Sequence, residues 1–152
     1  MKLDLGCGRN KKEGFIGIDI DNHYSKYYNS DEFICTSIPE GLKKFKDNSV
    51  VEVRAIHFIE HIPQNKVIYF MNEIYRILKK DGLFEIYVPP TTGRGAWSDP
   101  THVSWWNDMS FRYYDRDWHR ELTESYGIKC NFKTIKSELR EETCLHVVLK
   151  KE

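Results

Sequence analysis

Hydrophobic residues along the chain gather in short, nearly continuous runs that begin close to the N-terminus. Runs of this kind are typical of strands that are covered on both faces, because neither face then meets water. Five such strands are predicted, at residues 3–5, 15–21, 32–35, 50–56 and 83–88. Two further strand candidates, residues 128–135 and 143–150, alternate in polarity and lie close enough in sequence to form an antiparallel pair.

One stretch between the fourth and fifth strands has the period of a helix. Apolar residues recur there at steps of three and four from Val67 to Leu78, after Pro63 and before Asp81-Gly82, which we expect to end the helix. A second helix is predicted over about 115–126, and a weaker helical segment over 39–45. Strands that alternate with helices indicate an α/β fold: a mostly parallel sheet with helices on both faces and a C-terminal antiparallel hairpin.

Composition and charge narrow the function classes. The 152 residues are 40% hydrophobic and 30% charged, which suits one domain, residues 1–152, with a sizeable core. No apolar run approaches the roughly 18 residues of a membrane span, and the N-terminus does not resemble a signal peptide. The 23 basic and 23 acidic residues balance, which disfavours binding of nucleic acid through an overall positive charge. The four cysteines are scattered without a C-x-x-C pair, so we expect reduced thiols and a cytoplasmic location.

The turn Gly6-Cys7-Gly8 after the first strand is the first candidate for binding chemistry. Two glycines alone fit a tight turn equally well, but an acid, Asp19, ends the second strand, and ligands of open parallel sheets bind at this edge. The turn is poorly suited to a dinucleotide. Lys11 stands where the dinucleotide-binding pattern G-x-G-x-x-G has its third glycine, and the connection between the first two strands is too short for a crossover helix. A nucleoside without phosphate, such as S-adenosylmethionine, fits better.

Several segments together resemble the class I S-adenosylmethionine-dependent methyltransferases, in the small type 11-like subgroup. The similar segments follow the family's order from residue 1 to about 90: residues 3–8, 17–19, 47–52, 59–62 and 78–83. Residues 99–103 and 144–149 are similar to a subgroup with a short first loop. The resemblance implies a Rossmann-like fold, S-adenosylmethionine as cofactor and methyl transfer to an acceptor.

The resemblance also assigns roles to single residues. Backbone contacts to the amino-acid end of the cofactor are expected from Gly6, Cys7 and Gly8, with Asp4 orienting the loop or receiving the ammonium group. Asp19 is expected to accept hydrogen bonds from the ribose hydroxyls. The adenine and the methionine end are assigned to a further set: Ile20 and Ile38 around the adenine, Ser37 near its edge, and His57 beside the methionine end.

Two other functions stay open. The family usually has an aspartate at the position of Val51. This difference supports a non-catalytic protein that binds S-adenosylmethionine or serves as a scaffold with the same fold. An NAD-dependent oxidoreductase is the other alternative, and the missing third glycine weakens it.

Residues His57 to His61 spell the metalloprotease pattern H-x-x-E-H. That chemistry requires both histidines on one helical face and a third ligand from later in the chain. A helix is not expected here, because the pattern follows an apolar strand directly and Pro63 comes two residues later. We therefore predict no metal site, and expect Glu60 and His61 to hydrogen-bond to loop backbone.

A segment rich in aromatic residues, residues 89–114, follows the fifth strand as an insertion. It holds three of the four tryptophans, and its rings could form a satellite core, line an apolar pocket, or stack on bases or sugars. We predict that it forms the substrate-side wall and that His102 faces the methyl group as a base or substrate anchor. The alternative is that His102 only fixes the loop by hydrogen bonds. The acceptor is unidentified, a small molecule is favoured, and a homodimer stays open.

Overall fold

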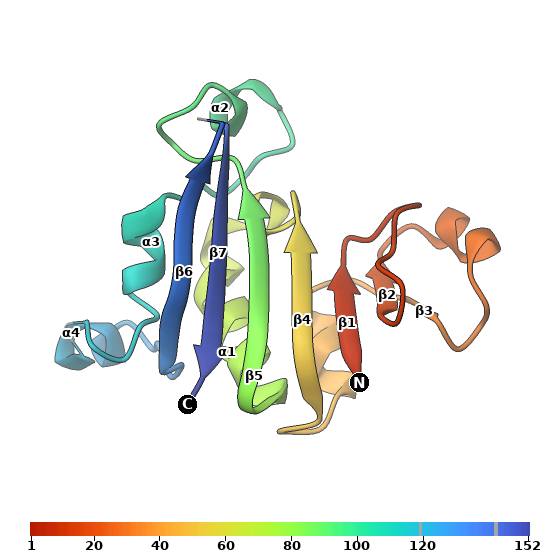
Figure 1. Ribbon diagram of the computed structural model, residues 1–152, viewed down its shortest axis with the longest axis horizontal. Helices are drawn as coiled ribbons and strands as arrows, with labels where there is room; N and C mark the ends of the chain where they lie inside the picture. The colour runs from red at the N-terminus through yellow and green to blue at the C-terminus, as the bar shows by residue number, and fades with distance from the viewer. Residues whose placement is uncertain (119, 142) are drawn as a thin grey trace.

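The computed structural model describes residues 1–118, 120–141 and 143–152. Seven strands of this described part form one sheet in the order β3-β2-β1-β4-β5-β7-β6 (Figure 1). Their bounds are β1 Lys2–Leu5, β2 Ile16–Asp19, β3 Phe33–Cys35, β4 Val50–Ile56, β5 Leu78–Val88, β6 Phe132–Arg140 and β7 Cys144–Lys151. Strands β1 to β5 pair in parallel, whereas β7 is antiparallel to both β5 and β6. The predicted mostly parallel sheet with a C-terminal antiparallel pair is confirmed.

Helix α1, whose period is clearest in the sequence, is the longest of the described helices, and the others are short. Their bounds are α1 Val67–Ile77, α2 Gly95–Ser98, α3 Asp108–Arg112 and α4 Arg120–Ser125, with 3-10 turns η1 Asn22–Tyr27, η2 Glu40–Lys44, η3 Ile59–His61 and η4 Gln64–Lys66. Helix α1 buries its apolar stripe, including Phe70, Met71 and Ile74, against the sheet and thereby forms the core.

The predicted helix over 115–126 is shorter than expected. Asp115 belongs to the neighbouring sheet edge instead: it forms a bridge with Phe132, and its side chain accepts from the amide of Thr134 at 2.8 Å. These bonds compete with helix formation, so α4 starts at Arg120. His119 lies outside the described residues.

The boundary between α1 and β5 also differs from the prediction. Asp81-Gly82 does not end the helix, because α1 ends at Ile77 and β5 begins at the next residue. Leu78 pairs with Val50, and the register then shifts so that Leu83 pairs with Glu52. Asp81, with a φ of +61°, lies in this irregularity of the strand. Pairing of the buried Leu78 with β4 therefore stops the helix before the predicted end at Asp81-Gly82.

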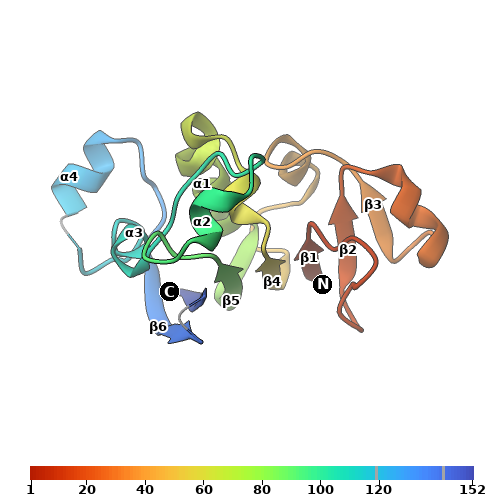
Figure 2. The ribbon, with the colours of Figure 1, turned by 90° about the horizontal axis from the view of Figure 1, so that it is seen from above.

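Helices pack on one face of the sheet, whereas we predicted helices on both. Figure 2 shows α1, α3 and α4 on the same side. Right-handed crossovers would place the β1–β2 and β2–β3 connections on the opposite face. These connections, residues 6–15 and 20–32, are fully described and contain no α-helix. In the described part of the chain, the second face therefore has no α-helix covering it.

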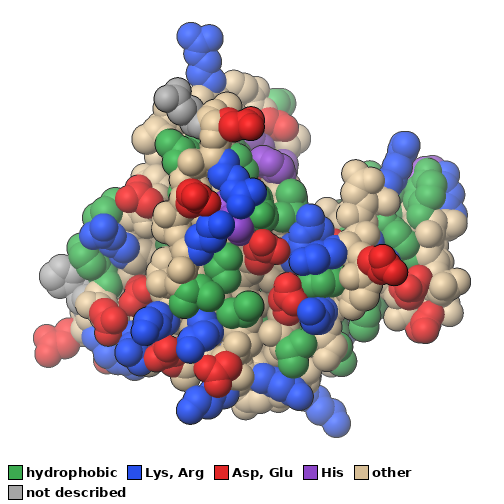
Figure 3. Space-filling model, viewed as in Figure 1, with side chains coloured by type: hydrophobic (Ala, Val, Ile, Leu, Met, Phe, Trp, Pro, Cys, Tyr) green, Lys and Arg blue, Asp and Glu red, His purple; other side chains and the backbone are tan. Residues whose placement is uncertain are grey.

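Charged side chains line this second face, which Figure 3 shows towards the viewer. Glu52 of β4 lies 2.7 Å from the Nζ atom of Lys2 and 3.7 Å from that of Lys12, and Lys12 also lies 3.9 Å from Glu85 of β5. Partly exposed ion pairs of this kind tolerate water, so the open face needs no apolar partner.

No helix of the described chain has the length and apolar character needed to cross a membrane.

Candidate functional site

The glycine turn follows β1 in a conformation that suits glycine. Gly6 and Gly8 have φ values of +62° and +50°, in the left-handed region. A Cβ atom on Gly6 would lie 2.3 Å from the Cδ2 atom of Phe58, which follows β4. Glycine at position 6 thus lets the segment after β4 pack directly on the turn.

The amides of the turn already have acceptors within the chain. Those of Gly6 and Cys7 donate to the carbonyl of Ile18 at 2.8 and 3.4 Å, and that of Gly8 donates to Oδ2 of Asp19 at 3.0 Å. These are the amides that we expected to meet the amino-acid end of a cofactor. The chain itself holds the turn in shape, and the amides reach a ligand only by sharing or exchanging these bonds.

Asp4 is buried in β1 beneath this turn, with 2% of its surface exposed. Its Oδ2 atom accepts from the amide of Lys12 at 2.8 Å and from Nη1 of Arg54 at 2.9 Å. The carboxylate therefore ties the end of the turn to β4, a geometry that agrees with the loop-orienting role predicted for Asp4.

Tyr28, which sequence reasoning missed, closes the turn from η1. Its hydroxyl donates to the carbonyl of Gly8 at 2.8 Å and accepts from the amide of Lys11 at 3.1 Å. Burial raises the pKa of the Tyr28 hydroxyl, so it stays a donor near neutral pH. Burial beside Asp19 and Asp4 likewise raises the pKa of the Cys7 thiol to about 12, which keeps it protonated. No motif marks Tyr28; only the packing of η1 on the turn reveals it.

Asp19 and the residues after it lie along the edge formed by β2 and β3. The carbonyl of Asp19 accepts from the amide of Thr36 at 2.9 Å, which holds the two strand ends side by side. Ile20 is 74% exposed, Ser37 is exposed, and Ile38 packs partly against the core. A half-exposed carboxylate that only accepts hydrogen bonds, next to an exposed apolar side chain, fits the ribose hydroxyls and the base of a nucleoside. In Figure 3 the surface is hollowed above the ends of β1 and β4.

His57 follows β4 with a φ of +47°, and its amide donates to the carbonyl of Tyr87 at 2.8 Å. Its Nδ1 atom lies 3.6 Å from Oε1 of Glu60. The nearby negative charge of that carboxylate raises the pKa of His57. Glu60 itself is 2% exposed, and neither of its carboxylate oxygens has a hydrogen-bond partner among the described residues.

The segment after β5 is bound to η3 by its backbone. The amides of Val103 and Ser104 donate to the carbonyl of Glu60 at 2.9 and 3.1 Å. This contact brings the Nε2 atom of His102 to 4.0 Å from Oε1 of Glu60, while Nδ1 lies 3.2 Å from the carbonyl of Ala96. The structure thus gathers both predicted histidines, His57 and His102, around one buried carboxylate. The expectation that Glu60 bonds to loop backbone holds for its carbonyl and not for its side chain.

The aromatic rings of residues 89–114 divide into two groups. Trp106 and Phe111 are buried and stack at 5.1 Å between ring centroids, as a satellite core would. Trp97 and Trp105 stack at 5.6 Å but are 61% and 44% exposed. The exposed pair lies in the same segment as His102.

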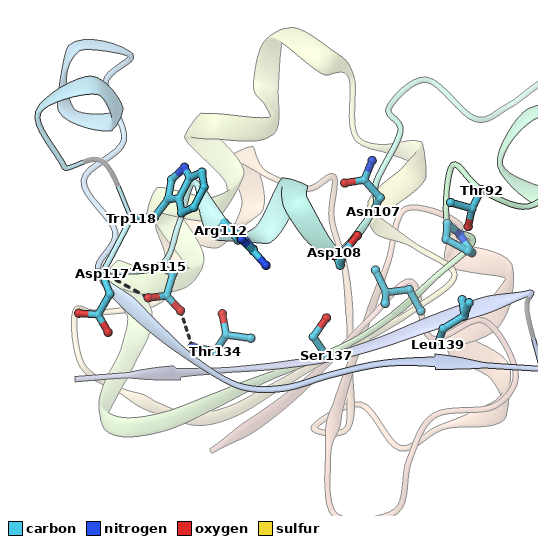
Figure 4. A pocket seen from close by; sticks show the side chains of 12 residues that line it. Thr92, Asn107, Asp108, Arg112, Asp115, Asp117, Trp118, Thr134, Ser137 and Leu139 are labelled. Atoms are coloured by element: carbon cyan, nitrogen blue, oxygen red, sulfur yellow. Dashed lines mark hydrogen bonds between the residues drawn. The ribbon is translucent and has the colours of Figure 1, made fainter.

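A cavity of about 680 Å³ lies away from the glycine turn, between α3 and the outer strand β6 (Figure 4). Asn107, Asp108 and Arg112 line it from one side, and Thr134 and Ser137 of β6 from the other. It is large enough for a small ligand, but β6 and the β1–β2 region lie at opposite parts of the sheet. Sequence reasoning did not point to it.

The chain is similar to known proteins both in sequence and in fold. The family described as "Methyltransferase domain" matches residues 3–86. A SAM-dependent methyltransferase from Archaeoglobus fulgidus superposes with a TM-score of 0.74 at 20% identity, over 99% of this chain and 85% of that one. A TehB-like SAM-dependent methyltransferase from Corynebacterium glutamicum has a TM-score of 0.63 at 16% identity, over 99% and 79% of the chains.

A third similar structure is the 1,6-didemethyltoxoflavin-N1-methyltransferase of Burkholderia thailandensis, with bound 1,6-didemethyltoxoflavin and S-adenosylhomocysteine. Its TM-score is 0.63 at 13% identity, over 99% of this chain and 70% of that one. A search of curated proteins gives no match. The family match covers more than half of the chain and contains the glycine turn and Asp19, which confirms the resemblance predicted from the motifs: the chain belongs to the methyltransferase-domain family.

Proposed function

We propose that this chain binds S-adenosylmethionine and transfers its methyl group to a small-molecule acceptor. The observation that carries the proposal is the meeting of three features at one sheet edge: the glycine turn after β1, Asp19 at the end of β2, and the Glu60–His102 pair beyond β4. The Burkholderia enzyme, which has bound S-adenosylhomocysteine and 1,6-didemethyltoxoflavin, supports the choice of cofactor and of a small-molecule acceptor.

The residues predicted from the sequence have suitable places for holding the cofactor. Asp19 would accept from the ribose hydroxyls, and Ile20 would cover the base together with Ser37 and Ile38. The turn Gly6-Cys7-Gly8, held by Asp4, and His57 would border the methionine end. S-adenosylmethionine supplies a methyl group on a positively charged sulfur, which an acceptor can displace directly.

The protein's part is then to align the acceptor, exclude water and, where the acceptor carries a proton, remove it. We assign the proton to His102. Its Nδ1 faces the carbonyl of Ala96, so Nε2 is the nitrogen that can receive it. The positive charge gained there lies 4.0 Å from the carboxylate of Glu60, which stabilises it. The exposed Trp97–Trp105 pair would cover the acceptor from the solvent side.

The whole chain, residues 1–152, would act as one domain, with residues 89–114 as the acceptor-side wall. We place the activity in the cytoplasm, because Cys7, Cys35, Cys130 and Cys144 are all free thiols, as a reducing compartment keeps them.

Calorimetric titration of the full chain with S-adenosylhomocysteine and, separately, with NADH tests the proposal. We expect binding of S-adenosylhomocysteine alone. Binding of NADH alone would favour the oxidoreductase alternative, and binding of neither would favour a scaffold protein. If S-adenosylhomocysteine binds, incubation with labelled S-adenosylmethionine and a metabolite extract should transfer label to a small molecule; label found only on protein or nucleic acid would contradict the acceptor class.

A further inference from the structure

We propose that Glu60, His61 and His102 bind one divalent ion of a first-row transition metal at the acceptor side of the site. The ligand set stands on its own geometry, whereas its place beside the acceptor rests on the proposed function.

The three side chains converge although they come from two distant segments. One ligating atom from each lies within 4.8 Å of the other two, and the rings of His61 and His102 have centroids 5.0 Å apart. Ligands of a zinc-like ion at about 2.0–2.2 Å from the metal lie roughly 3–3.5 Å from one another. Small side-chain rotations would close the remaining distance.

Both histidines are oriented as metal ligands are. Nδ1 of His61 lies 3.2 Å from the carbonyl of Thr101, and Nδ1 of His102 lies 3.2 Å from the carbonyl of Ala96. A neutral imidazole that donates from Nδ1 carries its lone pair on Nε2. Metal-binding histidines commonly donate their other nitrogen to a backbone carbonyl in this way, which fixes the tautomer and the ring orientation.

The side chain of Glu60 gives independent evidence for a bound cation. Its side chain is 2% exposed, and both carboxylate oxygens lack a hydrogen-bond partner among the described residues. Burial of an unpaired carboxylate is costly, and the nearest groups that can carry positive charge are His57 at 3.6 Å and His102 at 4.0 Å. A bound cation would compensate the buried negative charge of this carboxylate.

The ligand types indicate the kind of ion and its use. Two imidazoles and one carboxylate suit Zn²⁺, Co²⁺, Fe²⁺ or Mn²⁺ better than Mg²⁺ or Ca²⁺, which prefer oxygen ligands. Three protein ligands leave a position open, as in catalytic metal sites. An acceptor hydroxyl bound there would release its proton to solvent more readily, and His102, with Nε2 on the metal, would then serve as ligand in place of the base role proposed above.

The sequence predicted no metal site, and the ligand set proposed here differs from the one considered there. That prediction considered His57 and His61 on one helix. In the structure residues 59–61 form the turn η3, and the second histidine comes from His102, beyond β5. The predicted absence of a protease-like helix and the presence of a different ligand set are therefore compatible.

Titration of the metal-stripped full chain with Co²⁺, followed by calorimetry and visible absorption, tests the site. We expect one ion per chain, with ligand-field bands and no thiolate charge-transfer band. His61→Ala and His102→Ala should each weaken binding by more than about tenfold. His23→Ala is the matched control, because His23 is exposed on η1, and it should bind as the wild type does.

Glu60→Gln should also weaken Co²⁺ binding. If this buried substitution unfolds the chain, the two histidine variants test the site without it. A thiolate band, or wild-type affinity in both histidine variants, would overturn the inference. Titration of the metal-free chain with S-adenosylhomocysteine keeps the two proposals apart. Cobalt binding without cofactor binding would defeat only the proposed function, and the reverse result would defeat only the metal site.

Discussion

Asp19 and Gly8 are joined by a hydrogen bond of 3.0 Å from the glycine amide to Oδ2 of the carboxylate. The acid expected to bind a ribose therefore also holds the turn expected to border the methionine end. One residue couples the two halves of the proposed cofactor site, so its loss should affect both.

Asp19→Ala should weaken S-adenosylhomocysteine binding by about 1–3 kcal/mol, the range for losing hydrogen bonds to a charged group. Isothermal titration measures this change. Asp21→Ala is the matched control, because the Asp21 side chain accepts from the amide of His23 and caps η1. Loss of binding in the Asp21 variant with none in the Asp19 variant would show that the ribose acid is assigned to the wrong position.

Gly6→Ala should destabilise the chain far more than Gly14→Ala. Both glycines have a positive φ, so both substitutions carry a backbone strain of about 1–2 kcal/mol. A Cβ atom meets Phe58 at 2.3 Å in the first case and nothing within 4 Å in the second. Chemical denaturation measures the free energy of unfolding of both variants. The difference between them gives the cost of crowding against Phe58, because the backbone strain is common to both. Equal losses of stability would mean that Phe58 does not pack on the turn.

Arg76→Met should lower the free energy of unfolding by about 2–4 kcal/mol. The guanidinium donates to the carbonyls of Phe45 and Leu42 at 2.9 and 3.1 Å and pairs with Glu73 and Asp47, so it joins α1 to η2. Loss of charged donors from partly buried acceptors explains the magnitude.

The matched control for that substitution is Arg120→Met, which removes an exposed ion pair with Glu124 and an exposed hydrogen bond to Asn131. Its cost should stay below about 1 kcal/mol. Comparable losses in urea denaturation would contradict the bridging role of Arg76.

His146→Gln should make stability less sensitive to acid. Burial lowers the pKa of His146 below its ordinary 6.5, and its Nδ1 atom has no hydrogen-bond partner among the described residues. Above pH 6.5 His146 is neutral in both the folded and the unfolded chain, so it makes no pH-dependent contribution to stability. As the pH falls below 6.5 the unfolded chain binds the proton first, and stability declines until the folded pKa is passed.

Urea denaturation between pH 5 and 8 measures this decline (roughly the range over which histidine titrates). The wild type should lose stability towards pH 5, and His146→Gln should lose less. His23→Gln, an exposed change, should follow the wild type. A wild-type slope in the His146 variant would refute the buried neutral state.

Much of the fold could be predicted because strands and the long helix are marked by local patterns. The runs at residues 3–5 and 50–56 became β1 and β4, and the stripe from Val67 became α1. Gly8 and Asp19 could be predicted to lie close together, because parallel strands end at the same edge of a sheet, and their role in binding a cofactor stays a prediction. Where a pairing partner decided the outcome, as with Leu78 against Val50, local patterns failed.

Local patterns were enough to predict the positions of most strands and the residues of the glycine turn, and the order of several such patterns along the chain indicated the family. The remaining features depend on tertiary contacts. Packing left one sheet face without an α-helix among the described residues, brought Tyr28 onto the carbonyl of Gly8, and set His102 beside Glu60 through backbone bonds from Val103 and Ser104. Contacts between distant segments depend on how whole elements pack, and local periodicity carries no information about that packing.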